Sequence, residues 1–182
     1  MTTEVGQHQM WTAQYFNFKT PRTLISSGGL GTMGFGLGAA IGVKVANPDK
    51  TVFNIAGDGS FGMNCNEFAT AVKYNIPIKI IVMNNNALGM VRQWQSLFYE
   101  ARYSQTTLDR ATDFVKLAEA FGGVGFRVEK REELDSVLEE ALAVDRPVII
   151  DYRIDSDKKV FPMVAPGAPI HQIINEEDVV EE

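Results

Sequence analysis

The fold is decided by two apolar runs: residues 51–60 read TVFNIAGDGS, and residues 76–86 read IPIKIIVMNNN. Each run is short and rich in β-branched residues, which is typical of a strand covered on both faces. A helical pattern of apolar residues, which includes Phe68, Ala69 and Val72, lies between them. A strand, a helix and a second strand at this spacing predict a βαβ unit whose two strands are parallel neighbours.

The same alternation continues on both sides of this unit. The short apolar runs that we expect to form strands are Thr23–Ser26, Thr51–Ala56, Ile76–Asn84, Gly123–Val128 and Pro147–Tyr152. Apolar residues at helical spacing occur in 114–121 and again in 134–142, where glutamates flank them. The pattern predicts an α/β fold with a doubly wound, mainly parallel sheet and helices on both of its faces. Ligands of such sheets bind beyond the carboxyl ends of the strands.

The length of 182 residues fits one domain with a small appendage. We expect residues 1–154 to form the α/β domain and residues 155–182 to form a C-terminal tail. Three prolines between residues 161 and 169 exclude a helix or a central strand there. The apolar side chains of Phe161, Met163 and Val164 predict that this tail packs near the active site, with its last residues disordered.

Composition and charge exclude several classes of protein. Five of the six net negative charges come from the acidic residues of 176–182, so the rest of the chain is nearly neutral and has no footprint for nucleic acid. The N-terminal residues show no secretory signal, and no apolar run is long enough to span a membrane. Cys65 is the only cysteine, which excludes an internal disulfide and a cysteine-based metal cage. These features predict a cytoplasmic protein, and we interpret Cys65 as a small buried residue.

A glycine-rich motif at residues 29–34, GLGTMG, has the G-x-G-x-x-G spacing of dinucleotide-binding folds. In those folds an acidic residue about twenty positions later ends the second strand and binds a ribose. Here Asp49 stands at that distance, but it follows Pro48 in a turn before the second strand begins. We therefore do not favour nicotinamide binding, and the absence of G-x-x-x-x-G-K-[ST] excludes a P-loop.

Asp58 and the asparagines at 84–86 follow two strands that are expected to be neighbours. Because parallel strands end at the same edge of a sheet, Asp58 and an asparagine are predicted to face one crevice. A carboxylate and an amide oxygen are hard ligands suited to Mg²⁺, which usually completes its shell with phosphate and water. Gly57 and Gly59 allow the backbone to approach a phosphate, and a helix that begins near Ser60 would direct N–H groups at it.

Gly-Asp-Gly followed at this interval by Asn-Asn is similar to the diphosphate and metal signature of thiamine-diphosphate enzymes. Four further segments resemble the large catalytic subunit of acetolactate (acetohydroxyacid) synthases. These segments are Val5–Trp11 (VGQHQMW), Ser27–Gly34 (SGGLGTMG), Gly89–Gln95 (GMVRQWQ) and Val160–Val164 (VFPMV). The resemblance runs from Val5 to about Ile174 and covers the C-terminal third of that family's chains.

The resemblance implies a set of residues that hold thiamine diphosphate. They are Val5, Gly6, Gln7, His8, Gly31, Met33, Gly57, Asp58, Gly59, Ser60, Asn85, Leu88, Gly89, Met90 and Val91. By the same resemblance, Mg²⁺ is bound by the side chains of Asp58 and Asn85 and by the backbone carbonyl of Ala87.

The resemblance also implies individual roles. Gly57, Gly59 and Ser60 hold the diphosphate with help from Gln7 and His8. The Gly31 carbonyl and the Met33 backbone meet the aminopyrimidine, and the Met33 side chain bends the cofactor into a V shape. Trp94 shapes the pocket of the second substrate. Residues 169–171 (PIH) depart from the family's usual tail sequence.

The activity that the resemblance implies is that of a transferase of branched-chain amino-acid biosynthesis. It joins two pyruvates, or pyruvate and 2-oxobutyrate, into an acetohydroxy acid with loss of CO₂. The catalytic glutamate belongs to the pyrimidine-binding domain of a neighbouring subunit, and FAD is bound mainly by a middle domain. No segment here resembles either domain, so we expect this chain to be inactive alone. A homodimer and a regulatory small subunit are further expected partners.

Other interpretations of the sequence stay open at this point. The chain could be a natural subunit of a two-chain 2-oxoacid decarboxylase, or a binding or assembly module without catalysis. Among single residues, His8 could be a polar residue at a helix start, Met33 and Met90 could be core methionines, and Trp94 could belong to a core or an interface.

Overall fold

The computed structural model describes residues 1–109 and 112–179, and its centre is a five-stranded sheet. The strands are β1 (Thr2–Thr3), β2 (Phe53–Gly57), β3 (Lys79–Asn84), β4 (Val124–Val128) and β5 (Val148–Arg153). Their order across the sheet is β1-β2-β3-β5-β4, and every neighbouring pair is parallel. The predicted parallel α/β fold is therefore confirmed, and β2 and β3 are the neighbours that the βαβ spacing predicted.

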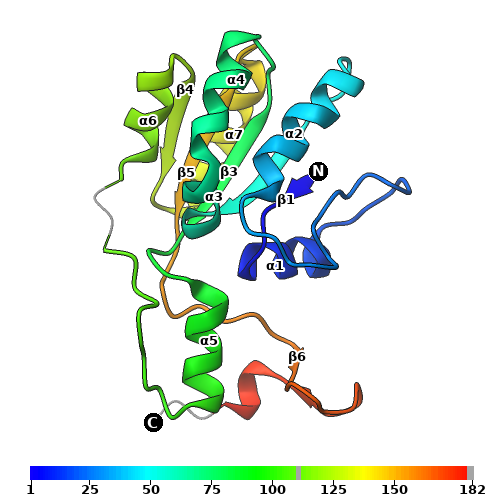
Figure 1. The fold of residues 1–182 in the computed structure, drawn as a ribbon, viewed down its shortest axis with the longest axis vertical. Helices are drawn as coiled ribbons and strands as arrows, with labels where there is room; N and C mark the ends of the chain where they lie inside the picture. Colours follow the sequence, from blue (N-terminus) through cyan, green and yellow to red (C-terminus); the bar gives the residue numbers. More distant parts are fainter. Residues whose placement is uncertain (110–111, 180–182) are drawn as a thin grey trace.

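Helices cover both faces of the sheet (Figure 1). One face carries α2 (Phe35–Ala46), α3 (Asp58–Asn64), α4 (Phe68–Lys73) and α6 (Phe114–Phe121), and the other carries α1 (Gln7–Tyr15) and α7 (Leu134–Ala143). The remaining helix, α5 (Gly89–Phe98), stands beyond the carboxyl edge of the strands, beside the C-terminal tail. No helix within the described ranges is long and apolar enough to cross a membrane.

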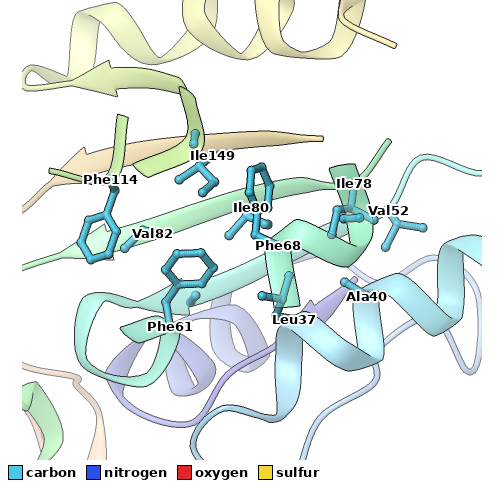
Figure 2. Close-up of a cluster of buried hydrophobic side chains, with 13 residues drawn as sticks. Leu37, Ala40, Val52, Phe61, Phe68, Ile78, Ile80, Val82, Phe114 and Ile149 are labelled. Carbon is cyan, nitrogen blue, oxygen red and sulfur yellow. The ribbon is translucent and has the colours of Figure 1, made fainter. Parts of the chain in front are cut away.

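The larger hydrophobic core lies between the sheet and the first group of helices (Figure 2). Ile80 and Val82 of β3 belong to the same buried cluster as Leu37 of α2 and Phe68 of α4, and all four side chains are fully buried. Every second residue of β2 and β3 points to this face, because successive side chains of a strand alternate. The core thus fixes the register of the two strands whose ends carry the predicted site.

The predicted strand Thr23–Ser26 is wrong. Within it only Ile25 pairs, through an isolated bridge to Thr2. The Ile25 N–H donates to the Met1 carbonyl at 3.0 Å, and the Thr3 N–H donates to the Ile25 carbonyl at 3.1 Å. The edge position of the sheet belongs instead to β1, whose two residues are too few to give a strand pattern in the sequence.

The tail is held against the rest of the molecule along residues 157–164. Val160 is fully buried and Met163 nearly so. Two short strands, β6 (Met163–Val164) and β7 (Ile173–Ile174), pair antiparallel within the tail. The predicted disorder of the last residues concerns 180–182, which lie outside the described residues.

Candidate functional site

A cavity of about 270 Å³ opens at the carboxyl edge of the sheet, between α1, α3 and α5. Its wall includes the residues that follow β2, those that follow β3, and Ile154 directly after β5. Every residue that the sequence implicates in cofactor or cation binding lines this cavity. These residues are Val5, Gly6, Gln7, His8, Gly31, Met33, Gly57, Asp58, Gly59, Ser60, Asn85, Ala87, Leu88, Gly89, Met90 and Val91.

The turn after β2 forms one side of the cavity. Ser60 closes this turn, because its Oγ accepts a hydrogen bond from the Gly57 N–H at 3.2 Å and donates to the Gly57 carbonyl at 3.1 Å. Asp58 begins α3, and its side chain is buried. A Cβ atom on Gly57 would stand 2.8 Å from His8 Nδ1, so only glycine lets the imidazole lie against this turn.

The loop after β3 forms the opposite side. Asn86 adopts a left-handed conformation with φ of 52°, which asparagine tolerates better than most residues and which turns the chain back. Asn85 Oδ1 accepts a hydrogen bond from the Ala87 N–H at 3.1 Å. The bridge between Ala87 and Thr107 is made through the Asn86 carbonyl and the Leu88 N–H, which leaves the Ala87 carbonyl outside those two hydrogen bonds.

Gln7 joins the two sides of the cavity through its carboxamide. Its Oε1 accepts a hydrogen bond from Asn85 Nδ2 at 3.2 Å. A Cβ atom on Gly89 would overlap Gln7 Oε1 and stand 2.7 Å from Asn85 Nδ2. Gly89 is therefore required for the close approach of these two amides to the start of α5.

His8 is a buried neutral imidazole. Burial lowers its pKa to about 3, so the ring carries no charge at neutral pH. Its Nε2 atom is buried without a hydrogen-bond partner among the described residues. Because buried polar atoms are normally paired, this nitrogen at the cavity wall is suited to a polar ligand group.

The rest of the wall is apolar. Leu88 Cδ2 would stand 2.8 Å from a Cβ atom on Gly59, and Met33 Cε would stand 3.9 Å from it, so both side chains lie against the first turn of α3. Met90 and Val91 extend this apolar surface along α5. The cavity thus has a polar end with Asp58 and Asn85 and an apolar end suited to an aromatic group.

Trp94 does not line this cavity. It lies one helical turn after Met90 and Val91 on α5, and its side chain is 40% exposed. Its ring stands edge-on to that of Phe98, with 6.1 Å between the ring centroids. It borders a second hollow, which shares Met90 and Val91 with the cavity. The structure therefore places Trp94 next to the candidate site and not inside it.

Five residues of the cavity wall were missed by the sequence reasoning: Gln9, Met10, Trp11, Met83 and Ile154. The first three continue α1 beyond His8, and they stand inside the VGQHQMW segment that already carried the resemblance. Ile154 follows β5, which lies beside β3 only because of the strand order β3-β5-β4. No sequence signal for that order was recognised.

The donor set at the polar end fits a hard divalent cation. Within the described ranges no group of three or more His, Cys, Asp or Glu side chains could hold a metal ion. A cation here would instead take one carboxylate oxygen from Asp58, the amide oxygen of Asn85 and the carbonyl of Ala87. Such an all-oxygen set with room for phosphate and water is typical of Mg²⁺ sites.

Comparison with known proteins identifies the class of this fold and site. A family profile described as "Thiamine pyrophosphate enzyme, C-terminal TPP binding domain" matches residues 4–152. The chain therefore belongs to the thiamine pyrophosphate enzymes, as a C-terminal TPP-binding domain.

The relatives narrow the class to one kind of enzyme, as the sequence motifs implied. The chain is 51% identical over its whole length to the mitochondrial acetolactate synthase catalytic subunit of Saccharomyces cerevisiae, of which it covers 26%. It is 50% identical, again over its whole length, to the probable acetolactate synthase large subunit of Methanococcus aeolicus, of which it covers 30%. It is 48% identical over 92% of its length to the isozyme 2 large subunit of Escherichia coli, of which it covers 31%. The chain thus spans between a quarter and a third of these relatives, and its resemblance to them is confirmed.

Proposed function

We propose that this chain binds thiamine diphosphate in the cavity and anchors the diphosphate with Mg²⁺. The observation that carries the proposal is the meeting of Asp58 and Asn85 in one cavity, from the ends of two neighbouring parallel strands. An acid and an amide in this arrangement supply the oxygen ligands, and Ala87 adds a backbone carbonyl.

The diphosphate would lie along the turn of Gly57, Gly59 and Ser60. His8 is neutral, and its Nδ1 lies against this turn, 2.8 Å from where a Cβ atom on Gly57 would stand, so an uncharged imidazole borders the diphosphate position. The Gln7 carboxamide lies on the same side of the cavity. The role of His8 is thus to border the diphosphate with an uncharged imidazole.

The aminopyrimidine would lie at the apolar end. Its surroundings would be Gly31, Met33, Leu88, Met90 and Val91, all of which line the cavity. Thioether and branched side chains in these positions can support a bent cofactor by packing alone. Trp94, in the adjoining hollow, would contact the second substrate.

In the complete enzyme we propose the reaction of the relatives: two 2-oxo acids are condensed to an acetohydroxy acid with release of CO₂. Bound thiamine diphosphate supplies the electron sink for the decarboxylation. This chain's residues bind and orient it, and Asp58 and Asn85 hold its cation. The catalytic glutamate is expected from the pyrimidine-binding domain of a second subunit. A homodimer, a regulatory subunit, FAD in a middle domain, a role in branched-chain amino-acid synthesis and a cytoplasmic location remain predictions.

Isothermal titration with thiamine diphosphate in the presence of Mg²⁺ tests the binding proposal. We expect saturable binding by the unaltered chain that is abolished by a chelator. Loss of a direct ligand in Asp58→Asn should weaken binding by more than the ~10- to 100-fold typical of residues that only support a ligand. Asp49→Asn makes the same substitution in an exposed turn and should leave binding unchanged. Equal binding by Asp58→Asn and the unaltered chain would refute the site.

The expected dependence on a partner has its own test. The purified chain, given pyruvate, thiamine diphosphate and Mg²⁺, should release no acetolactate. Product formation by the chain alone would show that its own residues are sufficient for turnover.

A further inference from the structure

Gln93 of α5 is a buried amide whose hydrogen-bonding groups are fully used. Its side chain is only 2% exposed. Its Oε1 accepts from the Val160 N–H at 2.7 Å and from Gln7 Nε2 at 2.9 Å. Its Nε2 donates to the Val160 carbonyl at 2.9 Å and to Met163 Sδ at 3.1 Å. Gln93 therefore connects the tail to a residue of the candidate cofactor site.

The direction of this amide is set by the backbone of the tail. A side-chain amide can be turned end for end, but a peptide N–H can only donate and a peptide carbonyl can only accept. Val160 presents both groups to the same side chain. Gln93 must therefore turn Oε1 to the Val160 N–H and Nε2 to the Val160 carbonyl.

The orientation of the Gln93 amide in turn fixes the orientation of the Gln7 amide. Both N–H groups of Gln7 Nε2 are engaged, one with Gln93 Oε1 and the other with the Lys158 carbonyl at 2.8 Å. Gln7 Oε1 is left to accept from Asn85 Nδ2. The nitrogen of Asn85 is thus held toward Gln7, and its oxygen accepts a hydrogen bond from the Ala87 N–H.

We propose that Gln93 is a positioning residue for the cation site: through Gln7 it holds the Asn85 amide with its oxygen, and not its nitrogen, available to a divalent ion. The proposal rests on the proposed Mg²⁺ site. The amide nitrogen offers no ligand to a hard cation, so the direction of the Asn85 amide decides whether the residue can bind. Outer partners of this kind orient metal ligands and tune their affinity.

Mn²⁺ binding, followed by electron paramagnetic resonance in the presence of thiamine diphosphate, tests the proposal on the full chain. Gln93→Leu and Gln93→Met remove both the donor and the acceptor and should weaken Mn²⁺ binding by ~10- to 100-fold. Gln93→Glu keeps an acceptor oxygen for Val160 N–H and Gln7 Nε2, so its loss should be smaller. The use of two apolar variants keeps the test valid if one of them does not fold.

Gln14→Leu is the matched control. Gln14 also binds the tail through its amide, because its Nε2 donates to the Pro162 carbonyl at 3.0 Å, but it is exposed, and the hydrogen bonds of Gln7 go to Gln93, Lys158 and Asn85. This variant should loosen the tail and leave Mn²⁺ affinity unchanged. Hydrogen exchange of residues 158–163 without cation measures the loosening and should rise in Gln93→Leu as well.

The outcomes separate the two proposals. If the unaltered chain binds no Mn²⁺ with thiamine diphosphate, the proposed site and this inference both fail. If the unaltered chain binds and the apolar Gln93 variants bind equally well despite faster tail exchange, Gln93 only anchors the tail and the inference alone is overturned. An equal loss in Gln14→Leu would also overturn it, because tail contact in general would then explain the effect.

Discussion

The core under the sheet and the cavity at its edge are built from the same two strands but differ in chemistry. Ala56 and Val82 are fully buried in the apolar core, whereas Asp58 and Asn85, only two and three positions further along the chain, are buried polar residues that line the cavity. The core is stabilised by apolar contacts of low directionality. In the cavity, directed hydrogen bonds and close approaches at glycines fix each side chain. Burial therefore stabilises the fold in one region and prepares a ligand site in the other.

The largest effect should come from the core. Phe68→Ala removes a fully buried ring whose centroid lies 6.2 Å from that of Phe121. The substitution should lower the free energy of unfolding by about 3–5 kcal/mol. Urea unfolding measures this loss. The folded fraction should keep its affinity for thiamine diphosphate, since Phe68 does not line the cavity. A loss of affinity in a variant that is fully folded would contradict the separation of the two regions.

Gly89→Ala in the cavity should weaken cofactor binding and leave the stability of the fold unchanged. The added methyl group displaces Gln7 Oε1 and crowds Asn85 Nδ2, so affinity for Mg²⁺ and thiamine diphosphate should fall by ~10- to 100-fold. Isothermal titration gives the affinity, and thermal unfolding of the ligand-free chain gives the stability. Unchanged affinity would show that the approach of Gln7 to α5 has no part in binding.

A third test uses the pH dependence of stability. The unfolded chain protonates His8 near pH 6.5, but the folded chain does so only near the lowered pKa of about 3. His8 thus contributes stability that is fully present above pH 6.5 and is lost as the pH falls toward 3. Between those limits the unaltered chain should lose about 1.4 kcal/mol per pH unit more than His8→Gln does. Urea unfolding at pH 7, 6 and 5 measures the two slopes, and equal slopes would contradict a buried neutral His8.

The smallest effect should come from a glycine outside both regions. Gly38 is an exposed position within α2, and apart from its chain neighbours and the adjacent helix backbone no atom lies within 4 Å of a Cβ atom placed there. Gly38→Ala should raise the free energy of unfolding by about 0.5–1 kcal/mol, because alanine favours a helix more than glycine does. Its thiamine diphosphate affinity should be unchanged. A destabilised Gly38→Ala variant would show that other atoms occupy the space beside this position.

The sequence predicted the central strands well because burial on both faces leaves a continuous apolar run. The observed β2 and β3 fall within two or three residues of the predicted limits. Helix α1 was not predicted, because Gln7–Tyr15 carries polar and apolar residues without a helical stripe. Strand β1 is two threonines and gives no periodicity at all. Both are set by contacts with distant strands, which local patterns do not report.

For the candidate site, spacing predicted that Asp58 and one of the asparagines at 84–86 face one crevice, and the resemblance implied Asn85 and the remaining residues. What the sequence did not reveal is how the side chains of the site are connected. The hydrogen bonds from Asn85 to Gln7 and from Gln7 to Gln93 join residues up to 86 positions apart. Such contacts depend on the strand order and on the path of the tail, neither of which has a local signal.

The most direct test of the central claim is a crystal structure of the chain with thiamine diphosphate and Mn²⁺, with the cation located by its anomalous scattering. We predict a single peak at the carboxyl edge of the sheet, about 2.1 Å from oxygens of Asp58, Asn85 and Ala87 and in contact with the diphosphate. A bound cofactor whose cation lies away from Asp58 and Asn85 would contradict the claim.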